Sequence, residues 1–203
     1  QKEILQLLAL TFARIGDVCA MKWADIDLNA KTWIFEPQKG KNRADMVDSL
    51  IVPLAPQTIA ILEQVHDITG GMEYVFYTGK RKNAPYADRQ QINKALNDPS
   101  MNKAKIGKDY CGRGYLEVHS PHGFRASAKT MLMERLGYSH LITEIQSGRS
   151  MPDAYGNTYN RMEAIKERVK MMNEWANYLD DIKAGKVDNI LFVDFNKAKA
   201  INE

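Results

Sequence analysis

Apolar residues recur at steps of three and four along much of the chain, which is the pattern of amphipathic helices. The clearest stripe lies between residues 162 and 182 and consists of Met162, Ile165, Val169, Met172, Ala176 and Leu179. Spacing, proline and glycine positions predict further helices at 1–12, 17–23, 56–67, 88–97, 122–135 and 139–146. We expect the last long helix either to close the core of its own domain or to dock on a neighbouring subunit.

Short runs of β-branched and aromatic residues predict strands at 32–35, 49–54, 74–77 and 190–195. A polar stretch at 38–43 separates the first two and suits a long hairpin turn. Aspartate and asparagine residues mark 25–30 as a loop, and 78–86 is a basic loop. The expected fold class is α+β, mostly helical with a small antiparallel sheet.

Composition narrows the function classes only a little. The chain has 203 residues, of which 44% are hydrophobic and 26% charged, so it suits one globular domain or one domain with a small appendage. The formal net charge of +3 permits nucleic-acid binding without requiring it. No apolar run is long enough to span a bilayer, and no signal peptide pattern is present.

The two cysteines, Cys19 and Cys111, favour a reducing intracellular setting over a disulfide framework. His119 and His122 follow Cys111 at a spacing that is not standard for zinc ligands, so we expect neither a metal nor a cofactor. The chain begins with Gln1 and not Met, and we expect it to be a piece of a longer protein that lacks its N-terminal part.

Several polar residues have the chemistry to act on an anion. His122 and Arg125 are three apart on a predicted helix, so both side chains can face one anion near the helix N-terminus. Arg14 follows an apolar helix, where either Asp17 or a phosphate would satisfy its charge. Tyr159 lies at the entry to the last helix, where it either packs in the core or reacts.

Lys39 and Lys41 lie at the tip of the expected hairpin. Lysines in a turn are usually only solvated. A lysine on such a hairpin can also reach into a site and give up a proton.

In this order, the features resemble the tyrosine recombinase (phage integrase) family: an arginine after an apolar helix, a hairpin lysine, H-x-x-R, a further His or Trp, and a tyrosine. The local sequences that carry the resemblance are 7–14, 23–27, 51–54 and 122–126. The stretch 158–179 is similar to P4-like prophage and genomic-island integrases in particular. The resemblance covers residues 4 to 182 and implies the catalytic-domain fold of that family.

The resemblance implies a role for each matching position. Arg14 and Arg125 correspond to paired phosphate-binding arginines, and Tyr159 to the nucleophile. His122 corresponds to the first histidine of the family, and Asp17 to an acidic residue that supports the first arginine.

The chain departs from the family pattern in two places. The hairpin is longer than usual, so that counting from Trp33 favours Lys41 as the catalytic lysine, whereas the Lys-Gly spacing favours Lys39; we prefer Lys41. Arg149 stands ten residues before Tyr159, where the family usually has His or Trp, and this departure keeps open the alternative of a degenerate integrase that binds DNA without cutting it. Residues 98–118 look like an insertion without an assigned role.

The resemblance implies DNA cleavage and rejoining through a 3′-phosphotyrosyl intermediate, which integrates or excises a mobile element. The expected partners are double-stranded DNA attachment sites and further copies of the chain in a tetrameric synapse, with no membrane. Basic side chains expected to contact phosphates, or else only to be solvated, are Lys80, Arg81, Lys82, Lys103, Lys105 and Lys108.

The expected domain organisation is a catalytic domain at 1–183 and a C-terminal strand and tail at 184–203, without the upstream DNA-binding domains of the family. A bacterial or phage-encoded protein of the cytoplasm, associated with the nucleoid, fits this interpretation. Two alternatives stay open: a degenerate integrase that binds DNA without cutting it, and an activity like that of type IB topoisomerases.

Overall fold

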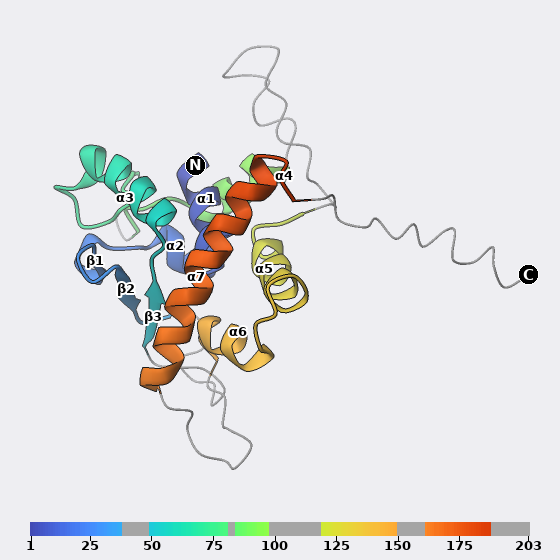
Figure 1. Cartoon of the computed structure of the whole chain (residues 1–203). Coiled ribbons are helices and arrows are strands. Elements are labelled where there is room, and N and C mark those ends of the chain that lie inside the picture. Colours follow the sequence, from blue (N-terminus) through green and yellow to red (C-terminus); the bar gives the residue numbers. More distant parts are fainter. Residues whose placement is uncertain (38–48, 81–83, 98–118, 150–160, 188–203) are drawn as a thin grey trace, which may run out of the picture.

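Figure 1 shows the arrangement of the helices and strands, which enclose two large hydrophobic clusters and a small third one of Leu10, Ala55 and Ala176. The computed structural model describes residues 1–37, 49–80, 84–97, 119–149 and 161–187. In these ranges the helices are α1 (Lys2–Thr11), α2 (Ile15–Cys19), α3 (Pro56–Thr69), α4 (Arg89–Asn97), α5 (Gly123–Glu134), α6 (His140–Gln146) and α7 (Arg161–Lys183), with a 3-10 helix η1 (Trp23–Asp25). The strands are β1 (Ile26–Asp27), β2 (Thr32–Phe35) and β3 (Leu50–Pro53). The expected class, mostly helical with a small antiparallel sheet, is confirmed.

The three strands form an antiparallel sheet in the order β1-β2-β3. Successive side chains of a strand point to opposite faces, and β2 follows this rule: Trp33 and Phe35 are buried, whereas Ile34 is 46% exposed. In the register of β2 and β3, Trp33 lies opposite Val52 and Ile34 lies opposite Ile51. One face of the sheet therefore contributes to the core.

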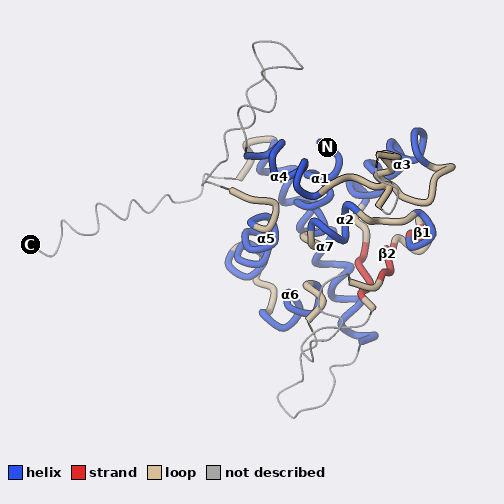
Figure 2. Tube along the Cα trace, turned by 180° about the vertical axis from the view of Figure 1, so that it is seen from behind, coloured by secondary structure: helices blue, strands red, loops and turns tan. Residues whose placement is uncertain are grey.

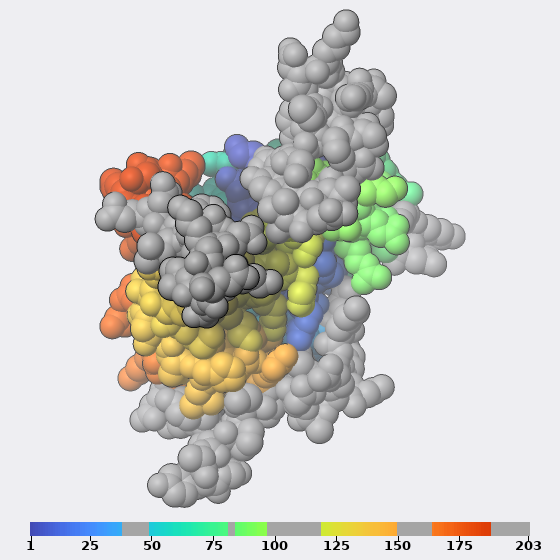
Figure 3. All heavy atoms as spheres, turned by 90° about the vertical axis from the view of Figure 1, so that its right-hand side faces the viewer, coloured from blue at the N-terminus to red at the C-terminus, as the bar shows by residue number. Residues whose placement is uncertain are grey.

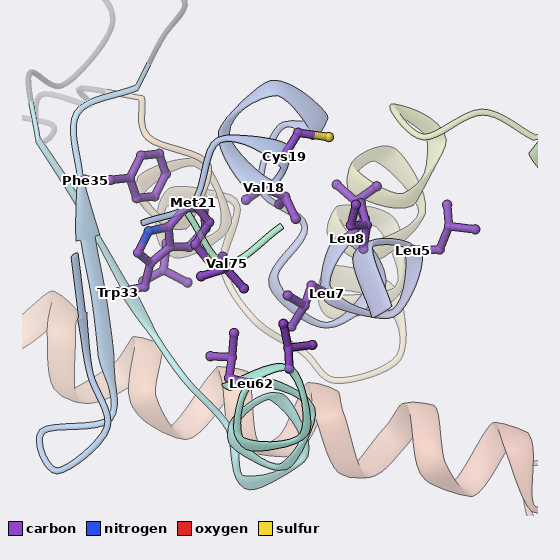
Figure 4. Packing of buried hydrophobic residues seen from close by; sticks show 14 of the residues in the cluster. Leu5, Leu7, Leu8, Val18, Cys19, Met21, Trp33, Phe35, Leu62 and Val75 are labelled. Carbon is purple, nitrogen blue, oxygen red and sulfur yellow. The ribbon is translucent and has the colours of Figure 1, made fainter. Parts of the chain in front are cut away.

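The first hydrophobic cluster joins the sheet to α1 and α3. Figure 4 shows Trp33 and Phe35 beside Met21, with Leu7 and Leu62 reaching toward the same region. The Trp33 and Phe35 rings are stacked with centroids 3.9 Å apart. Burying such large apolar surfaces is the main favourable contribution to folding.

The second cluster lies between α1, α5, α6 and α7, and it includes Phe12, Leu132 and Trp175. Phe12 ends α1 in the left-handed conformation, with φ 39° and ψ 30°. Because α1 supplies side chains to the first cluster and Phe12, its C-cap, packs in the second, the turn that follows lies between the two clusters. Arg14 lies in that turn.

Helix α7 packs against α1, α6 and β3, and the views from the two sides show it crossing the other helices (Figures 1 and 2). Met171, Met172 and Ala176 are buried. The indole Nε1 of Trp175 donates a hydrogen bond to the carbonyl of Ala9 (2.9 Å), and its ring meets Phe12 edge to face. The expectation that this helix closes the core of its own domain is therefore confirmed.

The predicted stripe on this helix is wrong at one position. Val169 is 43% exposed, whereas its neighbour Arg168 is only 6% exposed. Arg168 donates from Nε to Gln146 Oε1 (2.8 Å) and from Nη2 to the carbonyl of Ile51. Hydrogen-bond acceptors on α6 and β3 thus compensate a buried arginine at a position that the predicted stripe did not include.

Three local predictions are also corrected. The helix predicted at 17–23 ends at Cys19 and is followed by η1. The strand predicted at 74–77 is absent, since this described segment makes only the isolated bridges Lys22–Tyr74 and Tyr77–Tyr86. The loop predicted at 25–30 contains β1, because Ile26 pairs with Trp33.

Some predictions concern residues outside the described ranges. They are the hairpin turn at 38–43, the strand at 190–195, the insertion at 98–118, and the tail at 184–203 beyond residue 187. The division of the chain at residue 183 stays a prediction. In the part of the chain that is described, no helix is long and apolar enough to cross a membrane.

We expect Trp175→Ala to lower the free energy of unfolding by about 3–5 kcal/mol, because it removes a large buried ring from the second cluster. Trp175→Phe keeps a ring and loses the hydrogen bond to Ala9, which costs about 1 kcal/mol. Urea denaturation measures both. A loss below about 1 kcal/mol for the alanine variant would contradict the packing of α7 on α1.

Candidate anion-binding active site

Arg125 is the structural centre of the candidate site. It is the third residue of α5 and only 9% exposed. Its Nη1 donates to the carbonyl of Phe12 (3.2 Å), and its Nη2 donates to the carbonyl of Ser147. A single guanidinium thus connects the start of α5 to the end of α1 and the end of α6.

The charge of Arg125 is not fully compensated in the structure. Burial lowers its pKa to about 10, the positive charges of Arg14 and Arg149 act in the same direction, and the negative charge of Asp17 partly opposes them. A lowered pKa means that the surroundings disfavour the protonated guanidinium. An anion bound beside it would reverse this effect.

The turn after α1 brings Arg14 close to Arg125. After Phe12 the chain reverses, and Arg14 becomes the N-cap of α2 with extended backbone angles (φ −74°, ψ 143°). Asp17 lies in the first turn of α2 and is 5% exposed. Because the Phe12 carbonyl accepts a hydrogen bond from Arg125, the turn that carries Arg14 is attached to the start of α5.

The turn after α6 brings Arg149 to the site. The Ser147 carbonyl accepts from Arg125, Gly148 has φ +75°, and the backbone N–H of Arg149 donates to the carbonyl of Glu144 (3.1 Å). The Arg149 side chain is 52% exposed. The left-handed glycine lets the chain turn back, so that Arg149 acts on the charge of Arg125.

Glu144 is a charged residue that the sequence did not single out. It is only 1% exposed, its Oε2 lies 3.1 Å from Arg149 Nε, and its Oε1 accepts a hydrogen bond from Lys129 Nζ. The ring of His140 also approaches it, with Nε2 3.5 Å from Oε1. Burial and the positive charges of Arg149 and Arg125 lower the pKa of Lys129 even though its ammonium group contacts Glu144.

A signal for Lys129 was present in the sequence. It stands four residues after Arg125, so both lie on the same face of α5. Glu144 had no comparable signal, because its partner Lys129 is fifteen residues away and on a different helix. Only the packing of α5 against α6 brings the two together.

His122 lies at the N-cap of α5, exposed to solvent. It borders a cavity of about 350 Å³ whose other lining residues are Ile15, Arg89, Gln90, Asn93, Ser120 and Pro121. Figure 3 shows this side of the molecule, where blue atoms of the N-terminal elements lie between yellow atoms of α5 and green atoms of α4. The cavity adjoins Arg14 through Ile15, which is its neighbour in the chain.

Among the other predicted residues, Lys80 alone lies in the described ranges. Lys80 is exposed and borders a separate cavity of about 480 Å³ between α1, α3 and α4. The predicted residues outside the described ranges are Tyr159, Lys41, the alternative Lys39, Arg81, Lys82, Lys103, Lys105 and Lys108. No group of three or more His, Cys, Asp or Glu is arranged to hold a metal ion in the ranges that the structure describes.

The arrangement of Arg14, Arg125 and Arg149 suits a tetrahedral oxyanion. Guanidinium groups are planar, keep their charge at neutral pH and donate two parallel hydrogen bonds to phosphate oxygens. Asp17 and Glu144 are buried acids near opposite members of this group. The site thus has an excess of positive charge and is built from three separate parts of the chain.

A comparison with protein families agrees with this geometry. The model of the phage integrase family matches residues 1–146, which is most of the chain and includes Arg14 and Arg125. This chain belongs to the phage integrase family. The family predicted from the motifs is therefore confirmed.

Prophage and phage integrases align with nearly the whole chain. The prophage integrase IntA of Escherichia coli (strain K12) is 26% identical over 192 residues, which are 95% of this chain and 41% of IntA. The integrase of Enterobacteria phage P4 is 25% identical over 208 residues, covering 98% of this chain and 44% of that protein. The chain thus spans about two fifths of the length of these relatives.

A solved structure of a transposon integrase has the same fold. The Tn1549 transposon integrase, solved in complex with circular intermediate DNA, superposes with a TM-score of 0.50 at 12% sequence identity. The alignment covers 83% of this chain and 58% of that one. The expected tyrosine recombinase catalytic-domain fold is therefore confirmed.

We expect Gly148→Ala to destabilise the turn before Arg149, because a side chain disfavours φ +75° and the new Cβ would lie 3.3 Å from Leu50 Cδ2. The backbone conformation alone costs about 1–2 kcal/mol. Gly137 is the matched control, since its φ is +72° and nothing lies within 4 Å of an added Cβ. In thermal denaturation, Gly148→Ala should lower Tm more than Gly137→Ala, and equal losses would contradict the close approach to Leu50.

We also expect inorganic phosphate to stabilise the folded chain by binding beside Arg125. For millimolar affinity, 10 mM phosphate raises Tm by about 3 °C relative to chloride at equal ionic strength. Arg125→Met should abolish this increase. Arg135→Met removes an exposed arginine outside the site and should preserve it. A phosphate effect that survives Arg125→Met would contradict the assignment of the site.

Proposed function

We propose that this chain is the catalytic part of a site-specific DNA recombinase that cleaves and rejoins DNA through a covalent bond to Tyr159. The observation that carries the proposal is the group formed by Arg14, Arg125 and Arg149 in a member of the phage integrase family. Such an enzyme integrates or excises a mobile element. Its substrate is double-stranded DNA at an attachment site.

The arginines act on the charge that develops during cleavage. When an oxygen nucleophile attacks a phosphodiester, negative charge accumulates on the two non-bridging oxygens of the phosphorus. Preorganised cationic donors aimed at these oxygens stabilise the transition state. Arg14 and Arg125 supply the main donors, and Arg149 donates in place of the His or Trp that is usual in the family.

The covalent step forms one bond and breaks another. The phenolic oxygen of Tyr159 forms a bond to phosphorus while the bond from phosphorus to the 5′ oxygen breaks, which leaves a 3′-phosphotyrosine and a 5′ hydroxyl. The phenol has an ordinary pKa of about 10 and loses its proton with the assistance of His122. Lys41, with Lys39 as the alternative, protonates the departing 5′ oxygen.

Rejoining is the same step in reverse. A 5′ hydroxyl from another strand attacks the phosphotyrosine, and Tyr159 leaves with its proton restored. Since the phosphodiester is exchanged for a bond of similar energy, the reaction needs no nucleotide cofactor. Exchange between two duplexes requires several active sites, so we propose self-association on DNA in a tetrameric synapse.

Contacts to the DNA backbone come from basic side chains outside the group of arginines. Lys80 is exposed beside a cavity near α4 and suits such a contact. Each lysine that neutralises a phosphate releases counterions, so affinity falls as salt rises. Further contacts are proposed for Arg81, Lys82, Lys103, Lys105 and Lys108. The place of action is the cytoplasm, at the nucleoid.

The experiment uses a nicked duplex in which cleavage releases a short strand and traps the covalent adduct. Because the attachment site is unknown, the duplexes form a pool of candidate tRNA-gene ends. We expect a protein–DNA adduct on a denaturing gel with the unaltered chain and none with Tyr159→Phe, since phenylalanine lacks the attacking oxygen. Tyr155→Phe changes the same residue type four positions away and should keep the adduct.

Each of the other results overturns a defined part of the proposal. Adduct loss in Tyr155→Phe but not in Tyr159→Phe would reassign the nucleophile. DNA binding in a gel shift without an adduct would favour the degenerate integrase. Relaxation of supercoiled DNA without strand exchange between duplexes would favour activity of the type IB topoisomerase kind.

A further inference from the structure

Glu144 is the most deeply buried acidic side chain among the described residues and lies at the edge of the candidate site. It is 1% exposed, and Asp17 is the other acid that is buried in this part of the chain. The two acids serve different arginines: Asp17 acts on the charge of Arg125, whereas Glu144 contacts Arg149 directly. A buried carboxylate is costly unless charged partners meet it.

The partners of Glu144 divide between its two oxygens. Oε1 accepts from Lys129 Nζ on α5, and Oε2 lies 3.1 Å from Arg149 Nε. Lys129 therefore supplies a counter-charge from the interior side, with 22% of its side chain exposed. With one carboxylate between two cations, the positive charge of Arg149 is not cancelled by its contact with Glu144.

The ion pair also holds the guanidinium of Arg149 beside the carboxylate of Glu144. An arginine donates from Nε and from two terminal nitrogens, and the three groups form a rigid planar fork. Nε is the guanidinium nitrogen that lies nearest to Glu144, 3.1 Å from Oε2, as an ion pair without hydrogen-bond geometry. The backbone adds a second restraint, because the N–H of Arg149 donates to the carbonyl of Glu144 (3.1 Å). One residue thus holds both the backbone and the side chain of Arg149.

We propose that Glu144 is a positioning residue that orients Arg149 toward the phosphate bound by Arg14 and Arg125. The inference rests on the proposed function, because it assigns Arg149 a donor role in DNA cleavage. Lys129 also belongs to this arrangement, because its ammonium group compensates the negative charge of the buried Glu144 carboxylate. An exposed arginine side chain without this support would lose more side-chain entropy when it bound the phosphate.

The test compares Glu144→Gln in two backgrounds of the 203-residue chain, the natural sequence and Arg149→Ala. Glutamine keeps the size of the side chain and removes its charge. The nicked duplex traps the adduct irreversibly, so slow rates can be followed over hours. We expect Glu144→Gln to slow adduct formation about tenfold in the natural background and less than about twofold in Arg149→Ala, with DNA affinity nearly unchanged.

A purely structural role gives a different result. If Glu144 only holds α5 to α6, Glu144→Gln lowers Tm and slows the adduct by the same factor in both backgrounds, which would overturn the inference. Glu174→Gln is the matched control, since Glu174 accepts a hydrogen bond from Tyr138 (2.7 Å) outside the site. It should leave the rate of adduct formation unchanged.

A second measurement separates this inference from the proposed function. The increase in Tm caused by inorganic phosphate is recorded for the same four proteins, and it requires no DNA cleavage. We expect Glu144→Gln to reduce the increase in the natural background and to have no further effect in Arg149→Ala. If no protein forms an adduct but the increases in Tm follow this pattern, the proposed recombinase function is overturned and the positioning of Arg149 by Glu144 is retained. If the adduct forms, but Glu144→Gln changes neither its rate of formation nor the increase in Tm caused by phosphate, only the positioning role of Glu144 is overturned.

Discussion

The structure around the candidate site depends on the hydrogen bonds of one buried guanidinium. Arg125 is largely shielded from water, and it donates hydrogen bonds to two backbone carbonyls, of Phe12 and Ser147. Those carbonyls end α1 and α6, and each is followed within two residues by another arginine of the site, Arg14 or Arg149. The bonds that make the burial of Arg125 possible are therefore also the bonds that assemble the three arginines.

The charges of this region explain why it suits an anion. Four cationic side chains, Arg14, Arg125, Lys129 and Arg149, meet two buried acids, Asp17 and Glu144. The acids lower the repulsion among the cations without cancelling it. Burial is the main cause of the lowered pKa of Arg125, and the positive charges of Arg14 and Arg149 lower it further. A phosphate in the transition state of cleavage, which carries additional negative charge, would be stabilised by the excess of positive charge.

A second buried arginine supports the same part of the fold. Arg168 on α7 donates to Gln146 on α6 and to the carbonyl of Ile51 on β3, and burial lowers its pKa to about 10. Gln146 is the neighbour of Ser147, whose carbonyl binds Arg125. The end of α6 is thus held by two arginines from different helices, which restricts the turn that leads to Arg149.

The sequence by itself determined the family and the helices with clear periodicity, because local patterns and motif order are properties of the chain. It also predicted Arg14, Arg125 and Arg149 as site residues. It failed where a residue's surroundings come from elsewhere: Val169 is exposed and Arg168 is buried because acceptors on α6 and β3 face that side of α7. The segment 74–77 is not a strand, because it pairs with other segments only through the isolated bridges Lys22–Tyr74 and Tyr77–Tyr86. Only the tertiary structure revealed Glu144, since a buried charge is tolerated through partners that packing brings from distant positions.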